Sequence, residues 1–481
     1  MSDLASASSP SPAPVEKQPW WSQMTRYHWV VMILCCLGWA TDCFNQQLFT
    51  IVKSPAIAEL MNLPEGDPQV GKYAGMATAL MLIGWATGGI FFGIWADKYG
   101  RVRIMLLSLV VFTVFTGWSG SLHDLNWFLL FRFLAGLGAG GQFAVCATIL
   151  AENLANRPRI VASGIMQCSA VIFNVFAALL TMGIAALAMA GTLSGATWRY
   201  AFMLGYLPLI LFLFNWKCLR EPEKWVKAKQ ESDAGGRKTG SLRELFGEKT
   251  ICYRVVMGML LAAIGIIGFW GIMMFAVDLN RSIFRRNALT EIGVQTEGVA
   301  AADLQKIIHE QTPENQMSIK KQVENMGALT SIMINLGSCV GMFLFAMVID
   351  FFGRRWTFTI FQSLSILSVL LVFLKTSTVL EVLLYCPLMG FSIGALLTGY
   401  TIYFPELFPT RLRSTAVSFC YNAGRYISAG GAAVFGLLTS VVFADTAEPF
   451  RWAGAVMSPI FILGIIIIWL MPETKGKPLP E

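Results

Sequence analysis

Charged residues are scarce in this chain. Asp, Glu, Lys and Arg make up only 14% of its 481 residues, whereas a soluble globular protein carries about a quarter. Hydrophobic residues make up 55%, and the mean hydropathy is +0.60. This deficit of charge excludes an ordinary soluble domain and indicates that most of the chain is surrounded by lipid.

The residues that enzymes and metal sites need are also sparse. The three histidines lie at the ends of apolar runs or outside them, at positions 28, 123 and 309. The ten cysteines fall in or beside apolar runs, and no spacing typical of metal ligands occurs. No nucleophile stands in the pattern of a hydrolase. We therefore expect no enzymatic activity, no disulfide, no metal and no cofactor. The net charge is +7, but no other feature of the sequence supports nucleic-acid binding.

Long apolar runs are what the sequence does contain. A transmembrane helix needs about 20 mainly apolar residues, and the absence of two-residue alternation argues against a membrane barrel. We expect twelve transmembrane helices, at residues 28–51, 73–96, 104–121, 127–150, 163–187, 199–219, 253–278, 328–350, 357–375, 380–403, 417–441 and 452–471.

The orientation follows from the loops. Residues 1–27 are rich in Ser, Pro and Ala without a small-residue cleavage site, so we expect a disordered tail before an uncleaved first helix. An even number of helices places both chain ends on one side of the bilayer. Lys and Arg are concentrated in the loops of that side, which the positive-inside rule assigns to the cytoplasm. We expect a monomeric protein of the plasma or inner membrane with both termini cytoplasmic.

The chain also repeats a set of loop motifs after about 250 residues. A loop with an acid, a glycine and an arginine follows the second apolar run and the eighth; its residues are Gly93, Asp97, Gly100 and Arg101, and then Ala346, Asp350, Gly353 and Arg354. A Glu-x4-Arg-x-Arg motif follows the fourth run and the tenth; its residues are Glu152, Arg157 and Arg159, and then Glu406, Arg411 and Arg413. Several matches in the same order indicate two six-helix halves.

This repeat predicts an all-α membrane protein with two six-helix pseudo-repeats. We expect an N-terminal half at 28–219, a cytoplasmic linker at 220–252, a C-terminal half at 253–471 and a cytoplasmic tail at 472–481. The hydrophilic stretch at 279–327 lies outside and is expected to form one or two short surface helices.

Three charged residues lie within the apolar runs, where each costs about 2.5–3.5 kcal/mol. Asp42 and Arg132 are both expected in the outer half of the membrane, so the long arginine can reach the carboxylate. Either Asp42 is a proton site whose partner changes during a conformational cycle, or the pair joins two helices, or Asp42 only hydrogen-bonds a neighbouring helix. Arg425 is expected about 12 Å above the cytoplasmic face, as a ligand for an anionic substrate or as a structural tie to carbonyl groups.

The repeated loops offer an acid near one helix end with arginines beside it. Asp97 with Arg101, and their copies Asp350 and Arg354, are candidate latches that hold the cytoplasmic helix ends together; alternatively they only fix the topology. The Glu-x4-Arg motifs are candidates for the same gating role.

Several uncharged polar side chains are also expected at membrane depth. Some of them should line a central aqueous cavity as substrate ligands, and the alternative for each is a hydrogen bond between helices. The candidates are Gln46, Gln167, Asn174, Asn335, Tyr400 and Asn422. Glycine-rich segments on the second and fourth runs are best explained by close helix packing.

These motifs resemble the major facilitator superfamily, in particular its sugar-porter and metabolite:proton symporter branches. The resemblance covers about residues 28–476. GIWADKYGR is similar to the family's loop between helices 2 and 3, IDFFGRR to its C-terminal copy, and RFLAGLGAGG to its helix 4 signature. PELFPTRLRSTAVSFCYNAGR is similar to the segment that spans helices 10 and 11. The resemblance implies the twelve-helix fold and alternating access between two halves.

The resemblance also implies site residues. Asp42 corresponds to the family's helix 1 proton-binding acid, Arg132 to its helix 4 partner, and Gln167 to a helix 5 sugar ligand. One departure concerns helix 7, because sugar porters carry paired glutamines there and GMLLAAIGIIGFWGIMMFAVDL has none. Arg425, in a Tyr-Asn-x-Gly-Arg context, is more similar to organic-acid symporters.

We therefore expect a secondary active transporter, a symporter that couples a proton to a small polar metabolite by alternating access. Organic carboxylates and sugar derivatives both remain candidate substrates. A uniporter or exporter of the same solutes is the main alternative, and a transport-inactive solute sensor is another.

Overall fold

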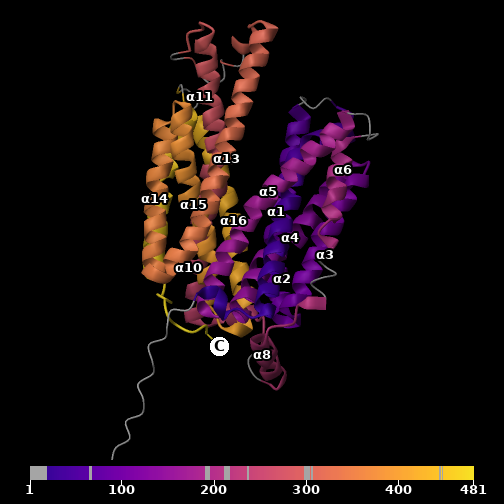
Figure 1. Cartoon of the computed structure of the whole chain (residues 1–481), viewed down its shortest axis with the longest axis vertical. Coiled ribbons are helices and arrows are strands. Elements are labelled where there is room, and N and C mark those ends of the chain that lie inside the picture. Colours follow the sequence, from indigo (N-terminus) through magenta and orange to yellow (C-terminus); the bar gives the residue numbers. More distant parts are fainter. Residues whose placement is uncertain are drawn as a thin grey trace, which may run out of the picture.

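The computed structural model describes residues 19–480 except for 64–67, 190–195, 211–216, 236–237, 297–298, 300–303, 305–306, 444–445 and 447. Within these residues the chain is helical and contains no strand. Figure 1 shows two helix bundles side by side, which meet at the end where α8 lies and spread apart at the opposite end. Of the tail expected at 1–27, residues 1–18 lie outside the described residues, whereas Trp20–Gln23 form η1 and the first membrane helix begins at Arg26.

The N-terminal bundle contains the first six membrane segments. It comprises η1 (Trp20–Gln23), α1 (Arg26–Met61), α2 (Pro68–Tyr99), α3 (Arg101–Trp118), η2 (Ser119–Ser121), α4 (Leu125–Asn153), α5 (Asn156–Met189), α6 (Thr197–Met203) and η3 (Leu204–Tyr206). Two short helices follow in the linker, α8 (Glu223–Asp233) and α9 (Leu242–Gly247).

The C-terminal bundle repeats this arrangement. It comprises α10 (Lys249–Ile266), η4 (Ile267–Met273), α11 (Phe275–Glu291), α13 (Pro313–Phe352), α14 (Arg354–Lys375), α15 (Val379–Leu407), η5 (Thr410–Leu412), α16 (Arg413–Leu437), η6 (Leu438–Val442), α17 (Pro449–Met457) and α18 (Ile460–Leu470). The η4 segment is a π-helical turn that continues α10 into α11.

The expected membrane architecture is confirmed. Ten helical segments of the described chain are long and apolar enough to cross a bilayer. Within the described residues each bundle thus has five such spans, with α6 and α16 at the positions predicted for the sixth and eleventh helices.

Several predicted boundaries are wrong. The seventh membrane helix was expected to end at 278 and the eighth to begin at 328, but α11 continues to Glu291 and α13 begins at Pro313. These continuations project beyond the rest of the bundle in Figure 1, where separate short surface helices were expected. Hydropathy marks where the lipid ends, and a helix can continue into water through polar residues with good helical propensity.

Glycines bring the helices of each bundle into backbone contact. A Cβ atom added to Gly88 of α2 would lie 1.8 Å from the Leu137 carbonyl oxygen of α4, and one on Gly140 would lie 2.1 Å from the Trp85 carbonyl oxygen. In the C-terminal half, a Cβ on Gly337 of α13 would lie 1.9 Å from the Pro387 carbonyl oxygen of α15. The contacts at Gly88 and Gly140 fix α2 against α4. These two helices carry Trp85 and Arg132 of the candidate site.

This packing predicts opposite effects for two Gly→Ala variants. Gly88→Ala should destabilise the protein by about 1–3 kcal/mol, because the new methyl group has to displace a backbone carbonyl. Gly183→Ala on α5, where nothing lies within 4 Å of the added Cβ, should be neutral or stabilising by up to about 1 kcal/mol. Thermal unfolding of the two purified variants in one detergent checks this, and equal melting temperatures would contradict the packing.

Candidate functional site

One end of the molecule is closed by buried ion pairs between the two halves. Glu152, at the end of α4, accepts hydrogen bonds from Arg101 of its own half at 3.1 Å and from Arg413 of the other half at 3.0 Å. The side chains of all three residues are fully buried. One carboxylate therefore holds an arginine from each half.

The C-terminal half contains the matching arrangement. Glu406, at the end of α15, accepts from Arg354 of its own half and from Arg159 of the N-terminal half, both at 2.6 Å. The two carboxylates and four arginines form a pseudo-symmetric set, which we call the closing network (Arg101, Glu152, Arg159, Arg354, Glu406 and Arg413).

Asp97 adds a further contact across the halves that its copy does not repeat. Its carboxylate pairs with Arg101 at 2.8 Å and accepts hydrogen bonds from the backbone of Ser414 and Thr415, at the start of α16. The repeat-related Asp350 stands near the end of α13, where its charge acts on Arg159 and Arg354.

In both motifs, the arginine that contacts the other half is not the one that was expected to have the gating role. Arg159 and Arg413 make these contacts, two residues after the candidates Arg157 and Arg411. Arg411 lies in η5 and pairs with Glu244 of the linker at 2.5 Å. The sequence motif contains both arginines of each pair, and only the turn that precedes the helix decides which one points between the halves.

Glutamates from the segments that follow the sixth and twelfth membrane helices cap α3 and α14. Glu221 accepts from the backbone N–H of Arg101 at 2.7 Å, and burial raises the pKa of this carboxyl above its ordinary value. Glu473 accepts from the N–H of Arg354 at 3.1 Å. Burial acts to raise its pKa, but four backbone N–H groups outweigh this effect and hold the pKa below its ordinary value.

The motif glycines allow these caps. Gly100 and Gly353 have φ angles of 122° and 85°, values that L side chains rarely adopt. Each stands just before the capped helix. Gly93 has a different role, because a Cβ there would lie 2.2 Å from the Ser418 hydroxyl of α16; it permits close contact between α2 and α16.

We expect Arg413→Ala to loosen the closed end, because removing one partner of a buried ion pair costs about 3–5 kcal/mol. Amide hydrogen exchange of residues 97–103 and 152–159 should become faster. Arg411→Ala is the matched control, since Arg411 pairs with the linker rather than with the other half. Unchanged exchange in Arg413→Ala, or equal acceleration in both variants, would show that the closing network does not hold the halves together.

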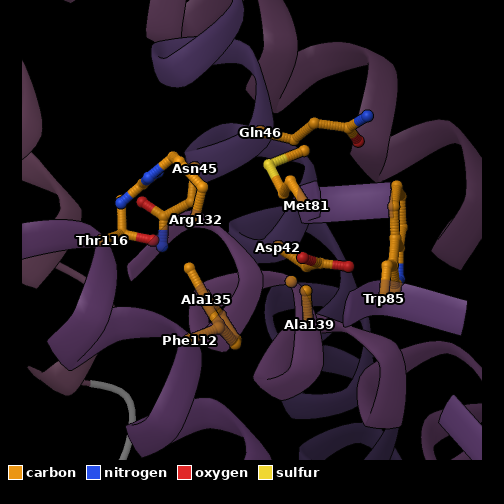
Figure 2. Close-up of a pocket in the computed structure, with 11 residues that line it drawn as sticks. Asp42, Asn45, Gln46, Met81, Trp85, Phe112, Thr116, Arg132, Ala135 and Ala139 are labelled. Atoms are coloured by element: carbon orange, nitrogen blue, oxygen red, sulfur yellow. The ribbon is translucent and has the colours of Figure 1, made fainter. Parts of the chain in front are cut away.

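Asp42 lies further into the membrane, on α1. It is only 2% exposed, and its Oδ2 atom has no hydrogen-bond partner among the described residues. It lines a cavity of about 20 Å³ between α1, α2, α3 and α4, which is room for about one water molecule. Figure 2 shows the Asp42 carboxylate directed toward Trp85.

Arg132 also lines this cavity but does not pair with Asp42. Figure 2 places its side chain on the side of Asn45 and Thr116, away from the carboxylate. The guanidinium donates to the Ser119 hydroxyl and, at 3.2 Å, to the Phe115 carbonyl oxygen. Three phenylalanine rings surround it, those of Phe49, Phe128 and Phe202. The expected contact between Arg132 and Asp42 is therefore not made in this conformation.

Arg425, on α16 of the other half, stacks on Trp85, which also lines the Asp42 cavity, but it makes no ion pair with Asp42 among the described residues. Its guanidinium stacks 3.7 Å from the centre of the Trp85 ring and 4.6 Å from that of Tyr421, and its Nη1 donates to Asn422 Oδ1 at 3.1 Å. Asp42 and Arg425 interact electrostatically, although they belong to different halves.

The sequence placed these two charges further apart in depth because the predicted start of the eleventh helix was wrong. α16 begins at Arg413 rather than at 417, so Arg425 stands about 18 Å along it at 1.5 Å per residue. Asp42 stands about 24 Å along α1 by the same rise. The corrected helix ends reduce the expected difference in depth between the two charges from about 9 Å to about 6 Å.

The polar candidates do not gather in one cavity. Gln46 lines the cavity beside Asp42, and Asn422 holds Arg425. Gln167 of α5 donates to the Leu397 carbonyl oxygen and the Thr401 hydroxyl of α15, both at 3.1 Å, so it joins the halves.

Three further candidates stand apart from the Asp42 cavity. Tyr400 is fully buried and donates to the Leu261 carbonyl oxygen at 2.9 Å, so its hydroxyl ties α15 to α10. Asn335 donates to Ser331 of its own helix at 2.8 Å. Asn174 is half-buried on α5.

Two residues of the site were missed. Trp85 carries the ring under Arg425, and Asn45 lies one helical turn after Asp42 with neither amide atom bonded within the described chain, although it is 4% exposed. The i, i+3 spacing of Asn45 from Asp42 is a signal that could have found it. No cluster of three potential metal ligands occurs in the described residues.

Comparison with known proteins agrees with this architecture. The sequence profile of the Major Facilitator Superfamily matches residues 28–295 and 314–481. A "Cis,cis-muconate transport protein" of Acinetobacter baylyi is 26% identical over 410 residues, covering 84% of this chain and 86% of that protein. A "Probable 4-methylmuconolactone transporter" of Cupriavidus pinatubonensis is 27% identical over 446 residues, covering 92% and 90%.

Solved structures share the fold. A proton:xylose symporter, XylE, superimposes with a TM-score of 0.71 at 18% identity and covers 94% of this chain and 98% of its own. The human organic anion transporter MFSD10 superimposes with a TM-score of 0.60 at 13% identity, covering 92% and 99%.

Proposed function

The chain belongs to the Major Facilitator Superfamily, and from this premise we propose that it is a proton-coupled symporter of small organic carboxylates. It is an integral membrane transporter of small molecules and not an enzyme. The observation that carries the proposal is that Asp42 of one half and Arg425 of the other lie beside the same residue, Trp85, which lines the Asp42 cavity and stacks on the guanidinium.

The chemistry of this pair links a proton to an anion. An ionised Asp42 neutralises Arg425, and a protonated Asp42 leaves the guanidinium available for another carboxylate. Binding one proton and one carboxylate group therefore keeps the charge beside Arg425 constant, which avoids an unpaired charge inside the membrane; a dicarboxylate such as cis,cis-muconate requires a second proton for its second carboxylate. Substrate and proton each favour the binding of the other.

The surroundings of Arg425 suit a carboxylate. Trp85 and Tyr421 hold the guanidinium between their rings, and a planar guanidinium with fixed orientation recognises carboxylates by paired hydrogen bonds. The relatives named for cis,cis-muconate and 4-methylmuconolactone are named for molecules that carry carboxylates. This supports an organic acid over a sugar.

The closing network then acts as the cytoplasmic gate. With both termini in the cytoplasm, as the loop charges predict, this conformation is closed toward the cytoplasm. Rocking of one half against the other would break the contacts of Glu152 and Glu406 with the arginines across the interface and expose the Asp42 site to the cytoplasm.

Arg425 variants test the substrate class. In a thermal-shift titration, cis,cis-muconate should stabilise the purified protein, and Arg425→Ala should weaken its affinity at least about 30-fold, because a truncated buried charge contact costs 2–5 kcal/mol. Arg425→Lys should be almost as weak, since a lysine lacks the planar fork. Arg451→Ala, at the opposite end of the molecule, is the control and should bind normally.

The same titration includes 4-methylmuconolactone and xylose. Stabilisation by xylose that survives Arg425→Ala would reject the carboxylate assignment and favour the sugar alternative.

An Asp42→Asn variant tests the proton. In proteoliposomes with an inward proton gradient, the native protein should accumulate labelled cis,cis-muconate above equilibrium, and Asp42→Asn should only equilibrate it. Exchange of internal for external muconate should persist, because a neutral Asn imitates the protonated acid. Asp278→Asn, an acid outside this site on α11, serves as the control.

Accumulation by Asp42→Asn equal to that of the native protein would rule out Asp42 as the coupling group. Native flux that is only downhill and independent of the proton gradient would favour the uniporter alternative.

A further inference from the structure

The two halves also meet where α5 packs against α13. This interface is apolar and contains two cysteines that face each other. The Cys168 thiol of α5 donates to the Cys339 carbonyl oxygen of α13 at 3.2 Å. Neither is fully buried. They line a groove of about 470 Å³ together with Ile165, Ser169, Ile172, Val340, Phe343 and Leu344.

These cysteines stand at the same level of the membrane. Cys168 is about 18 Å from the start of α5, and Cys339 is about 20 Å from the end of α13, at 1.5 Å per residue. Both distances run from the closed end. The two helices pack closely below this level, because a Cβ on Gly164 would lie 2.8 Å from the Ala346 Cβ.

The helices part beyond the cysteine pair. Leu179 and Met182 on α5 are 60% and 68% exposed, and Ile332 and Leu336 on α13 are 58% and 57% exposed. The cysteine pair thus lies between the closely packed part of the two helices and their exposed ends.

We propose that Cys168 and Cys339 are an oxidation site at which a small neutral oxidant of the peroxide class joins the two halves by a disulfide. Hydrogen peroxide converts one thiol to a sulfenic acid and releases one water. The second thiol then attacks this sulfur, the S–S bond forms, and the sulfenic oxygen leaves as a second water. Two thiols lose two electrons and two protons, and a thiol reductant reverses the change.

The disulfide arrests the transporter in the conformation seen here. α5 is about 51 Å long, and its contact with α13 lies in the part nearest the closed end. When the halves rock to open this end, the contact moves toward the other end of the helices and the cysteines separate. A disulfide holds the two Cα atoms within about 4.4–6.8 Å, so the bond and the opened state exclude each other.

Covalent joining of the halves is tested first. A protease site is inserted between Ala234 and Gly235 of the linker, where a Cβ on Gly235 has no neighbour within 4 Å. The full-length protein in membranes is treated with hydrogen peroxide, blocked with N-ethylmaleimide, cleaved, and run on a non-reducing gel. The native pair should give one band near 53.0 kDa, which separates into two halves after reduction.

Cys168→Ser and Cys339→Ser should each give separate halves after the same treatment. Cys386→Ser, which removes a buried thiol of α15, is the matched control and should remain joined. Separate halves in the native protein, or a joined product in Cys168→Ser, would overturn the proposal.

Arrest is tested without any substrate. Amide hydrogen exchange of residues 97–103 and 410–416, at the closed end, should be several-fold slower in the oxidised native protein than in the reduced one. Peroxide should have no such effect on Cys168→Ser. Joined halves with unchanged exchange would show that the disulfide forms but does not hold the closed end.

Discussion

Two buried glutamates hold the two halves of this protein together. Glu152 and Glu406 each bind one arginine from their own half and one from the other. A buried carboxylate that loses its partners is strongly destabilised, so neither glutamate can lose its arginines unless water replaces them. The network therefore favours two conditions, fully closed and dry or open and hydrated, over intermediates. This is the physical basis of the two-state gate that we propose.

Helices α2 and α16 connect the closed end to the region around Asp42 and Arg425. Asp97 on α2 caps the start of α16 at Ser414 and Thr415. About three turns further along α16, Arg425 stacks on Trp85 of α2. The same two helices thus carry a latch contact and the charge that interacts with Asp42. Any change in their separation acts on both, and this would link the proposed substrate site to the proposed gate.

The internal repeat made much of this arrangement predictable. It identified the loops with Asp97 and Arg101 and both glutamates, because the same spacing of charges appears twice. It could not choose between Arg157 and Arg159, since that choice depends on the local turn. The electrostatic interaction of Asp42 with Arg425 was missed for a different reason. Hydropathy gives the apolar part of a helix, and an error of four residues at the start of α16 changed the expected depth of Arg425.

The uncharged candidates were harder to predict. Tyr400 and Gln167 were correctly placed within the membrane, but a polar side chain there can bond a neighbouring helix as readily as a ligand, and both do so. Sequence distinguishes these outcomes only when the partner is known. Arg132 is a similar case, because the three phenylalanine rings around it come from three different helices. No local pattern indicates such an enclosure.

The two seams between the halves differ in chemistry. The seam of α2 with α16 contains the charged residues Asp97 and Arg425. Its contacts therefore depend on the charge of these side chains and on access of water. The seam of α5 with α13 contains Cys168 and Cys339 in an apolar groove, where neither a proton nor a carboxylate has a charged partner. A signal at the second seam therefore acts on the movement of the halves without altering the Asp42 site. In our proposals, two seams of unlike chemistry thus let one conformational change respond both to the transported solute and to oxidation of the cysteine pair.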